Sequence, residues 1–298
     1  MDKKILKELK SNGFMQQRQE NYFSMRLKNV GGHFTAEQLG TIKVVAEIFG
    51  AGYIHLTSRQ GIEIPFIKFN DIPAVKATLA AGGVEVGVCG ARIRTITACQ
   101  GNAICSSGNI DTLKIARELD RRYGGRELPH KFKIGVTGCA NNCLKAEEND
   151  IGIKGGAEPN WIPEKCIFCG ACKKICPAGA IEINRAEKIW AINRDKCINC
   201  GRCVKICKAA ALNCETGFII SFGGRYGNKI SVGKKILPLI KDEQTLYRVI
   251  EATLNFFNER AKMGERLSLT FERLGAEEFT EKIREAYDGQ KKFWCDTR

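Results

Sequence analysis

Apolar and polar residues alternate in short stretches over the first 85 residues, and glycine and turn residues separate the stretches. A two-residue period is typical of half-buried strands, whereas apolar spacings of three and four are typical of helices. Thr35 and Gln38 form a capping-box pair that marks the start of a helix, and Gly50 marks its end. The pattern therefore predicts strands over residues 22–29, 53–57 and 62–68, and helices over residues 35–50 and 71–81.

The rest of the chain is interrupted by a segment that is rich in cysteine. Around it, the pattern predicts a helix over 109–122, strands over 131–137 and 217–222, and amphipathic helices over 242–260 and 276–287. Residues 161–213 contain eight cysteines and an internal repeat, in which the segment 166–176 recurs 31 residues later at 197–207. We therefore predict an α+β protein in which residues 1–85 form a ferredoxin-like half-domain. Residues 86–160 and 214–298 form a larger α+β domain, and residues 161–213 are inserted into it.

Composition places the chain among ordinary globular proteins. It has 298 residues, of which 44% are hydrophobic and 27% charged. No apolar run approaches the roughly 20 residues of a membrane span, and the start of the chain lacks an apolar signal region, so we expect a cytoplasmic protein. The unusual feature is the presence of 15 cysteines, which in a reducing compartment indicates metal binding rather than disulfides.

The net charge of +14 allows several interpretations. Nucleic acid, an acidic membrane surface, an acidic partner protein, an anionic ligand and simple solubility are all compatible with a basic chain. The basic residues are dispersed, and no nucleic-acid-binding signature is present. Nucleic acid is therefore disfavoured as a partner.

Both halves of the repeat have the spacing C-x2-C-x2-C-x3-C. This is the spacing of a bacterial-type ferredoxin with two 4Fe–4S clusters, in which the fourth cysteine of each run binds the other cluster. The expected ligands are Cys166, Cys169, Cys172 and Cys207 for one cluster, and Cys197, Cys200, Cys203 and Cys176 for the second. Zinc is the alternative, although structural zinc sites seldom show this doubled spacing. Lys208 stands where a proline is expected after Cys207, which removes no ligand.

A third group of cysteines, Cys99, Cys105, Cys139 and Cys143, lies outside the repeat. Its spacing alone also permits zinc or scattered core cysteines. The surrounding segments, Thr-Ala-Cys-Gln-Gly at 97–101 and Lys-Phe-Lys-Ile-Gly-Val-Thr-Gly-Cys-Ala-Asn-Asn-Cys at 131–143, resemble the cluster motif of the siroheme-dependent sulfite and nitrite reductases. The resemblance extends to Leu-Thr-Ser-Arg-Gln at 56–60, Asp-Ile-Gly-Ile-Lys-Gly at 150–155 and Gly-Gly-Arg-Tyr-Gly at 223–227. The layout resembles in particular the anaerobic and dissimilatory sulfite reductase subunits, which have a two-cluster ferredoxin domain inserted after the second cysteine pair.

The resemblance implies a siroheme and, with the repeat, three 4Fe–4S clusters. The third cysteine group would hold the cluster coupled to siroheme, with Cys143 as the bridging ligand. The implied reaction is the six-electron reduction of sulfite to sulfide, with electrons that enter through the ferredoxin domain from a ferredoxin or a dedicated donor subunit. The alternatives are nitrite reduction to ammonia on the same scaffold, and an electron-transfer or siroheme-binding protein without physiological turnover.

Four basic residues, Arg59, Arg94, Lys131 and Lys133, match basic residues of the family's substrate pocket. Arginine binds anions through several hydrogen bonds and stays charged. Lysine can also release a proton, particularly when neighbouring cations lower its pKa. Lys131 and Lys133 share one face of the predicted strand, and two solvated strand lysines are the alternative.

Siroheme carries eight carboxylates, so the resemblance also implies a rim of basic and amide groups. The candidates are Arg92, Asn141, Lys145 and Arg225, with Gly223, Gly224 and Gly227 permitting close backbone approach. An ordinary surface role is the alternative for Arg92 and Lys145.

Each family motif occurs once in this chain, whereas assimilatory members contain two related halves with siroheme between them. We therefore expect a homodimer or pairing with a homologous subunit, and a small monomeric reductase is the alternative. Three oxidised clusters contribute roughly −6 and siroheme roughly −8, which nearly cancels the charge of +14. Cys89, Cys214 and Cys295 are left as buried or incidental thiols.

Overall fold

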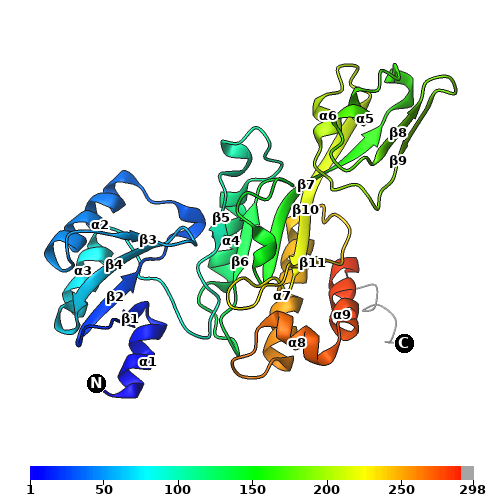
Figure 1. Cartoon of the computed structure of the whole chain (residues 1–298). Coiled ribbons are helices and arrows are strands. Elements are labelled where there is room, and N and C mark those ends of the chain that lie inside the picture. The colour runs from blue at the N-terminus through cyan, green and yellow to red at the C-terminus, as the bar shows by residue number, and fades with distance from the viewer. Residues whose placement is uncertain (290–298) are drawn as a thin grey trace, which may run out of the picture.

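The computed structural model of the chain describes residues 1–289, which form three parts (Figure 1). An N-terminal unit precedes a central domain built on a five-stranded sheet, and a small lobe lies at the far end of strands β7 and β10. Within the described residues, no helix is both long and apolar enough to cross a membrane.

The N-terminal unit is a four-stranded antiparallel sheet with the strand order β1-β2-β4-β3. Its elements are α1 (Lys3–Ser11), β1 (Phe14–Gln16), β2 (Tyr22–Arg26), α2 (Ala36–Ile48), β3 (His55–Leu56), β4 (Ile62–Lys68) and α3 (Ile72–Ala81). Phe23 and Met25 alternate into a core that they share with Ile42 and Val45 of α2. The predicted capping box at Thr35 is present. The α+β arrangement predicted for this unit is therefore confirmed.

The prediction for the N-terminal unit differs from the structure at three places. The predicted strand over 22–29 is too long, because β2 ends at Arg26. The prediction also misses α1 and β1, because α1 has no buried residue and β1 is only three residues long. The predicted strand over 53–57 is too long, because only His55 and Leu56 pair with β4. Gly52 has a φ of 76°, so the chain turns just before this segment, and Leu56 is 70% exposed on the edge strand.

The central domain has the strand order β11-β10-β7-β6-β5. Strands β5, β6 and β7 are parallel, whereas β10 is antiparallel to its neighbours β7 and β11. The elements are β5 (Thr97–Ala98), α4 (Thr112–Tyr123), β6 (Ile134–Thr137), β7 (Ile151–Trp161), β10 (Leu212–Phe222), β11 (Lys234–Lys235), α7 (Glu243–Arg260), α8 (Leu267–Leu274) and α9 (Glu277–Asp288). Phe132, Phe256, Phe257 and Phe279 are fully buried in the core. The three helices predicted here are confirmed as α4, α7 and α9, whereas α8 was not predicted.

Strands β7 and β10 pair along their full length of 11 residues. Strand β6 pairs only with the first part of β7, up to Lys154, so the far half of the pair is a two-stranded ribbon that leaves the sheet. The predicted strand over 217–222 therefore begins too late, because pairing with β7 continues through polar residues such as Asn213 and Glu215.

Residues 162–211 form the lobe at the tip of this ribbon, and we call this segment the cysteine lobe (Figure 1). It contains α5 (Ala171–Ile175), the hairpin of β8 (Ile181–Asn184) and β9 (Ile189–Ile192), and α6 (Arg202–Lys205). Trp161 pairs with Leu212 where the ribbon enters the lobe, and Trp161 stacks on Trp190 with a centroid distance of 5.5 Å. The lobe is thus joined to the central domain through two adjacent strand ends.

Candidate functional site

Five basic side chains line one cavity of about 250 Å³ between the N-terminal unit and the central domain. They are Arg26 of β2, Arg59 of the loop between β3 and β4, Arg94 before β5, and Lys131 and Lys133 before β6. The four residues that the sequence predicts to bind substrate therefore lie together. Within the described part of the chain, no carboxylate lines this basic cavity, so its charge suits an anion.

Arg26 is the cation of the basic cavity that the sequence did not single out. It forms an ion pair with Glu63 of the neighbouring strand, and its Nη1 lies 3.5 Å from Sγ of buried Cys89. The only sequence signal was its place in an alternating strand. Of the other two unassigned cysteines, Cys214 is partly exposed on β10, and Cys295 lies outside the described residues.

Two hydrogen bonds hold the guanidinium group of Arg59 in place. Its Nη1 donates to Oδ1 of Asn149 at 2.6 Å, and its Nη2 donates to the carbonyl of Thr95 at 3.1 Å. The next residue, Gln60, exchanges two hydrogen bonds with the backbone of Ala98, at 2.8 and 3.1 Å. Burial lowers the pKa of Arg59 to about 10, so it stays charged at neutral pH.

The guanidinium group of Arg94 is only partly hydrogen-bonded within the described part of the chain. Its Nε is buried and has no hydrogen-bond partner among residues 1–289, while its Nη1 lies 3.4 Å from the carbonyl of Val88. A buried N–H without an acceptor costs free energy. Arg94 also lines the basic cavity, so its positive charge contributes to binding an anion there.

Lys131 and Lys133 lie in an extended segment that precedes β6. The predicted strand over 131–137 is wrong at its start, because β6 begins at Ile134 and only Phe132 makes an isolated bridge, to Ile93. The side chains nevertheless alternate, so both lysines line the cavity while Phe132 is fully buried in the core. Burial and nearby arginines lower the pKa of Lys133 to about 8, and they also lower the pKa of Lys131.

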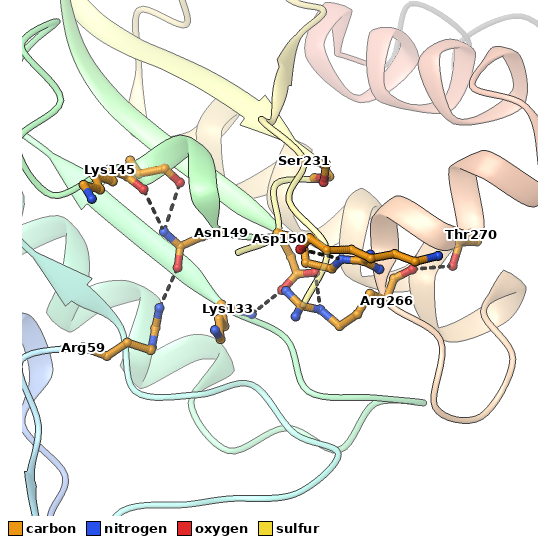
Figure 2. Close-up of polar contacts among 12 residues, drawn as sticks. Arg59, Lys133, Lys145, Asn149, Asp150, Ser231, Arg266 and Thr270 are labelled. Atoms are coloured by element: carbon orange, nitrogen blue, oxygen red, sulfur yellow. Dashed lines mark hydrogen bonds and ion pairs between the residues drawn. The ribbon is translucent and has the colours of Figure 1, made fainter. Parts of the chain in front are cut away.

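A buried ion pair lies next to Lys133 (Figure 2). Arg266, the residue before α8, donates Nε and Nη2 to the two carboxylate oxygens of Asp150 at 3.0 and 2.7 Å. The backbone N–H of Lys133 donates to the same carboxylate at 2.8 Å. Burial raises the pKa of Asp150, and the bonds from Arg266 oppose this shift. No sequence pattern predicts a role for Arg266, and Asp150 is marked only as the first residue of the Asp-Ile-Gly-Ile-Lys-Gly segment.

Asn149 connects Arg59 to the loop that follows the third cysteine group. Its Nδ2 donates to the carbonyl of Ala146 at 3.0 Å and to that of Lys145 at 3.4 Å, while its Oδ1 accepts from Arg59 (Figure 2). Asn149 is itself buried. The adjacent residues Asn149 and Asp150 thus position one arginine and one lysine of the basic cavity.

The glycine-rich loop at 223–227 packs against this same loop. A Cβ on Gly224 would lie 2.0 Å from the carbonyl oxygen of Glu147, so only glycine permits the approach. Gly223 has a φ of 79°, and Arg225 is buried. Around Gly227, by contrast, a Cβ would meet no atom of the described residues within 4 Å.

The remaining predicted siroheme contacts have protein partners. Lys145 has its ammonium 6.0 Å from the centroid of a tyrosine ring in the glycine-rich loop. Arg92 forms an ion pair with Glu127 at 2.5 Å, and Oδ1 of Asn141 accepts a hydrogen bond from Arg202 of the cysteine lobe at 3.1 Å. Lys145, Arg225 and the loop glycines therefore lie together, whereas Arg92 and Asn141 contact other segments of the chain.

The eight cysteines of the cysteine lobe line two small cavities, with four in each. The first cavity is lined by Cys166, Cys169, Cys172 and Cys207, and the second by Cys176, Cys197, Cys200 and Cys203. These are the two sets expected from the spacing, including the exchange of the fourth cysteine between the halves. Four thiolates are the usual ligand set of a 4Fe–4S cluster, so the residues present fit two clusters.

The two halves of the repeat also share backbone conformation. Phe168 and Asn199, which occupy equivalent positions, have φ values of 51° and 52°. The sulfurs of Cys176 and Cys207 each accept a hydrogen bond at 3.3 Å from the backbone N–H four residues further along. Hydrogen bonds to ligating sulfurs are one of the factors that set a cluster's reduction potential.

The third cysteine group comes from two loops that are bonded to each other. The backbone N–H of Gly138 donates to Sγ of Cys99 at 3.0 Å, and the carbonyl of Gly138 accepts from Asn109 at 2.7 Å. Cys139 is buried and Cys99 is partly exposed, whereas Cys105 and Cys143 are exposed. The four cysteines of the third group therefore differ in exposure, and two of them are accessible to solvent.

Within residues 1–289, no three His, Cys, Asp or Glu side chains converge closely enough to share a single metal ion.

Comparison with known proteins identifies the family. Residues 89–292 match the nitrite and sulphite reductase 4Fe-4S domain, and residues 15–82 match the nitrite/sulfite reductase ferredoxin-like half domain. The chain therefore belongs to the nitrite and sulfite reductase 4Fe–4S family, which confirms the resemblance inferred from its motifs.

Two relatives and one solved structure show how far the similarity reaches. The coenzyme F420-dependent sulfite reductase of Methanocaldococcus jannaschii is 36% identical over 266 residues, which are 89% of this chain and 42% of that protein. A subunit of the anaerobic sulfite reductase of Salmonella typhimurium is 35% identical over 178 residues, 55% of this chain and 52% of that protein. The chain thus spans about half the length of these relatives. The crystal structure of dissimilatory sulfite reductase I has a TM-score of 0.72 at 21% identity, over 88% of this chain and 69% of that chain, and shares the fold.

Replacement of Asp150 by Asn is expected to destabilise the central domain. The variant keeps the shape of the side chain but leaves Arg266 buried without a counter-charge, and removal of one partner of a buried pair costs about 3–5 kcal/mol. Thermal unfolding of the anaerobic holoprotein, followed by far-ultraviolet circular dichroism, measures the loss as a lower Tm. Lys282→Ala, which breaks an exposed ion pair with Glu259, is the matched control and should change Tm little. Equal shifts in the two variants would contradict the importance of the buried pair.

Proposed function

We propose that the chain is a siroheme-dependent sulfite reductase that converts sulfite to sulfide with six electrons. The observation that carries the proposal is the basic cavity, in which cations from separate segments surround one space without a lining carboxylate among the described residues. Sulfite is a small oxyanion, and guanidinium and ammonium groups bind such anions through charge-assisted hydrogen bonds. Two of the relatives described above are named as sulfite reductases, which supports this choice of substrate.

The cysteine groups and the glycine-rich loop suit the cofactors that the family implies. We assign Cys99, Cys105, Cys139 and Cys143 to the cluster coupled to siroheme, with Cys143 as the bridging ligand, and the two groups of the cysteine lobe to two ferredoxin-type clusters. Arg92, Asn141, Lys145, Arg225, Gly223, Gly224 and Gly227 are assigned to the siroheme rim. Siroheme held by these residues would supply one-electron redox chemistry at an iron centre.

Arg59 and Arg94 bind and orient the oxyanion. Arg59 is fixed by its bonds to Asn149 and Thr95, so it meets the anion without losing much conformational freedom on binding. Arg94 lines the same cavity and contributes a second guanidinium group. Burial lowers the pKa of Arg59 to about 10, so Arg59 remains charged throughout the neutral pH range.

Lys133 is the proposed proton donor. Its pKa of about 8 keeps it largely protonated at pH 7 while making its proton easier to release than that of an ordinary lysine. Conversion of sulfite to sulfide takes up six electrons and six protons and releases three waters, so protons must be delivered repeatedly. Lys131 lies beside it on the same cavity wall and adds a second cation with a lowered pKa.

Electrons are proposed to enter through the cysteine lobe from a ferredoxin or a dedicated donor subunit. The Salmonella relative is named as a subunit of its enzyme, which supports assembly with other chains. We also propose that this chain forms a homodimer or pairs with a homologous subunit, because each family motif occurs only once in it.

Nitrite reduction to ammonia is the second candidate, because the family models describe nitrite and sulfite reductases together and the cavity accommodates either anion. An electron-transfer or siroheme-binding protein without turnover is the third possibility and belongs to a different class.

Anaerobic purification tests the cofactors, and kinetics then test the substrate. We expect about thirteen irons per chain, from three cubanes and one siroheme, together with labile sulfide and an extractable tetrapyrrole. A colourless zinc protein would sink the proposal. Under the same anaerobic, low-potential conditions, kcat/KM should be higher for sulfite than for nitrite. If neither anion alters the siroheme spectrum, the chain is an electron-transfer or siroheme-binding protein instead.

The pH profile tests the role of Lys133. The protonated lysine is the active form, so kcat should fall as pH rises through about 8, the pKa of Lys133. Lys133→Arg keeps the positive charge but stays protonated far above this range. We expect the variant to have a lower kcat, since it releases protons poorly, and to lose the decline near pH 8. A decline at the same pH in both proteins would show that another group is responsible.

Sedimentation of the anaerobic holoprotein tests the assembly. A species of twice the chain mass is expected, and it should persist on dilution across the range used for activity assays. Activity in a species that sediments as a single chain would contradict the dimer.

A further inference from the structure

The cysteine lobe touches the central domain at sites other than the ribbon. Nη2 of Arg202 donates to Oδ1 of Asn141 at 3.1 Å, and Nζ of Lys205 donates to the carbonyl oxygen of Ser106 at 2.6 Å. Arg202 and Lys205 are the first and last residues of α6. One short helix of the lobe therefore reaches two separate loops of the central domain.

Both contacted loops carry cysteines of the third group. Asn141 lies midway between Cys139 and Cys143, and Ser106 directly follows Cys105. On the lobe side, α6 itself contains Cys203, which lines the second cysteine cavity. The contacts thus join segments that carry cysteines of two different groups.

The contacts also show which cysteine group of the lobe faces the central domain. The backbone N–H of Ala157, on the ribbon, donates to the carbonyl of Asn199 at 2.7 Å, and Arg194 forms an ion pair with Glu158 at 3.3 Å. Among the described residues, no hydrogen bond or ion pair joins residues 163–193 to the ribbon or the central domain. The group of Cys176, Cys197, Cys200 and Cys203 therefore lies on the near side, and the other group lies on the far side.

A two-stranded ribbon does not fix the orientation of a lobe by itself. Isolated strand pairs twist and bend more readily than strands inside a sheet. Beyond Lys154, β7 has no neighbour from β6, so the outer ribbon has this freedom. Electron transfer rates fall steeply with the separation of donor and acceptor, so a lobe that swings on its ribbon delivers electrons slowly.

We propose that Arg202 and Lys205 are positioning residues that clamp the cysteine lobe against the two cysteine loops of the central domain. They hold the near cysteine group close to the third cysteine group. The cluster that the near group would hold is then oxidised by one electron, the cluster that the third group would hold is reduced by that electron, and no atom is transferred. The electron-transfer part of this inference rests on the proposed function. The clamp itself rests only on the contacts of Arg202 and Lys205 with Asn141 and Ser106.

Hydrogen exchange of the anaerobic holoprotein tests the clamp directly. In the double variant Arg202→Ala/Lys205→Ala, amides in segments 103–108 and 139–145 should exchange about fivefold faster, in keeping with the loss of exposed hydrogen bonds from charged donors. Lys208→Ala is the matched control, since Lys208 is an exposed lysine of the same lobe with no hydrogen bond or ion pair among the described residues. The pair Arg202→Lys/Lys205→Arg keeps both cations and should restore slow exchange. Unchanged exchange in the alanine variant overturns the clamp.

The rate of electron transfer from the cysteine lobe to siroheme tests the consequence of the clamp. Reduced protein, kept in excess of a low-potential electron donor that supplies the six electrons needed per sulfite, is mixed with one equivalent of sulfite in a stopped-flow instrument, and the return of the reduced siroheme spectrum is followed. We expect about fivefold slower return in the alanine double variant, and wild-type rates in Lys208→Ala and in Arg202→Lys/Lys205→Arg. Equal rates in the alanine variant and the wild type overturn the positioning role. If the wild type does not react with sulfite, the proposed function fails, and hydrogen exchange alone decides the clamp.

Discussion

The buried ion pair between Asp150 and Arg266 is the interaction on which the arrangement of the site depends. Asp150 begins the turn into β7, and its carboxylate accepts two bonds from Arg266 and one from the amide of Lys133. Its backbone carbonyl accepts a further bond from Gly223 at 2.9 Å. One residue thus joins the lysine segment, the glycine-rich loop and the start of α8. Burying a charge pair is costly unless all its bonds are made, and here the carboxylate is fully used.

The same pair explains how the protein concentrates cations without neutralising them. Burial and the repulsion between cations lower the pKa of Arg59, Lys131 and Lys133, and the charge of Asp150 partly opposes this shift. Because both of its oxygens are occupied by Arg266 and a backbone amide, the carboxylate does not line the cavity or compete with an anion there. The carboxylate of Asp150 therefore stabilises the cations from outside the cavity, and the cavity itself stays electropositive.

The parts of the site that could be predicted are those encoded in short spacings. The cysteine sets of the lobe follow from a repeat whose turns recur with nearly identical backbone angles at Phe168 and Asn199. Lys131 and Lys133 could be placed together from alternation alone, even though regular strand pairing begins only at Ile134. Arg266 could not be predicted, because it is 116 residues from Asp150 and its role depends on how α8 packs. Long-range side-chain pairs leave no periodic trace in a single sequence, and Arg26 and Asn149 escaped prediction for the same reason.

The cysteine lobe must be both attached to the central domain and correctly oriented against it, and a cysteine motif alone specifies neither. Because β7 and β10 are adjacent and antiparallel, their ends meet at Trp161 and Leu212, and a segment of any length can be inserted there without changing the register of the sheet. Such an attachment tethers the lobe, and Asn199 and Arg194 bind it to the outer ribbon. The exposed cations of α6 add contacts with loops 61 and 99 residues away in sequence, and in the proposed clamp these contacts hold the lobe against the central domain. A chain could therefore retain every cysteine ligand and still transfer electrons poorly, because the distance between the groups depends on residues outside the cysteine pattern.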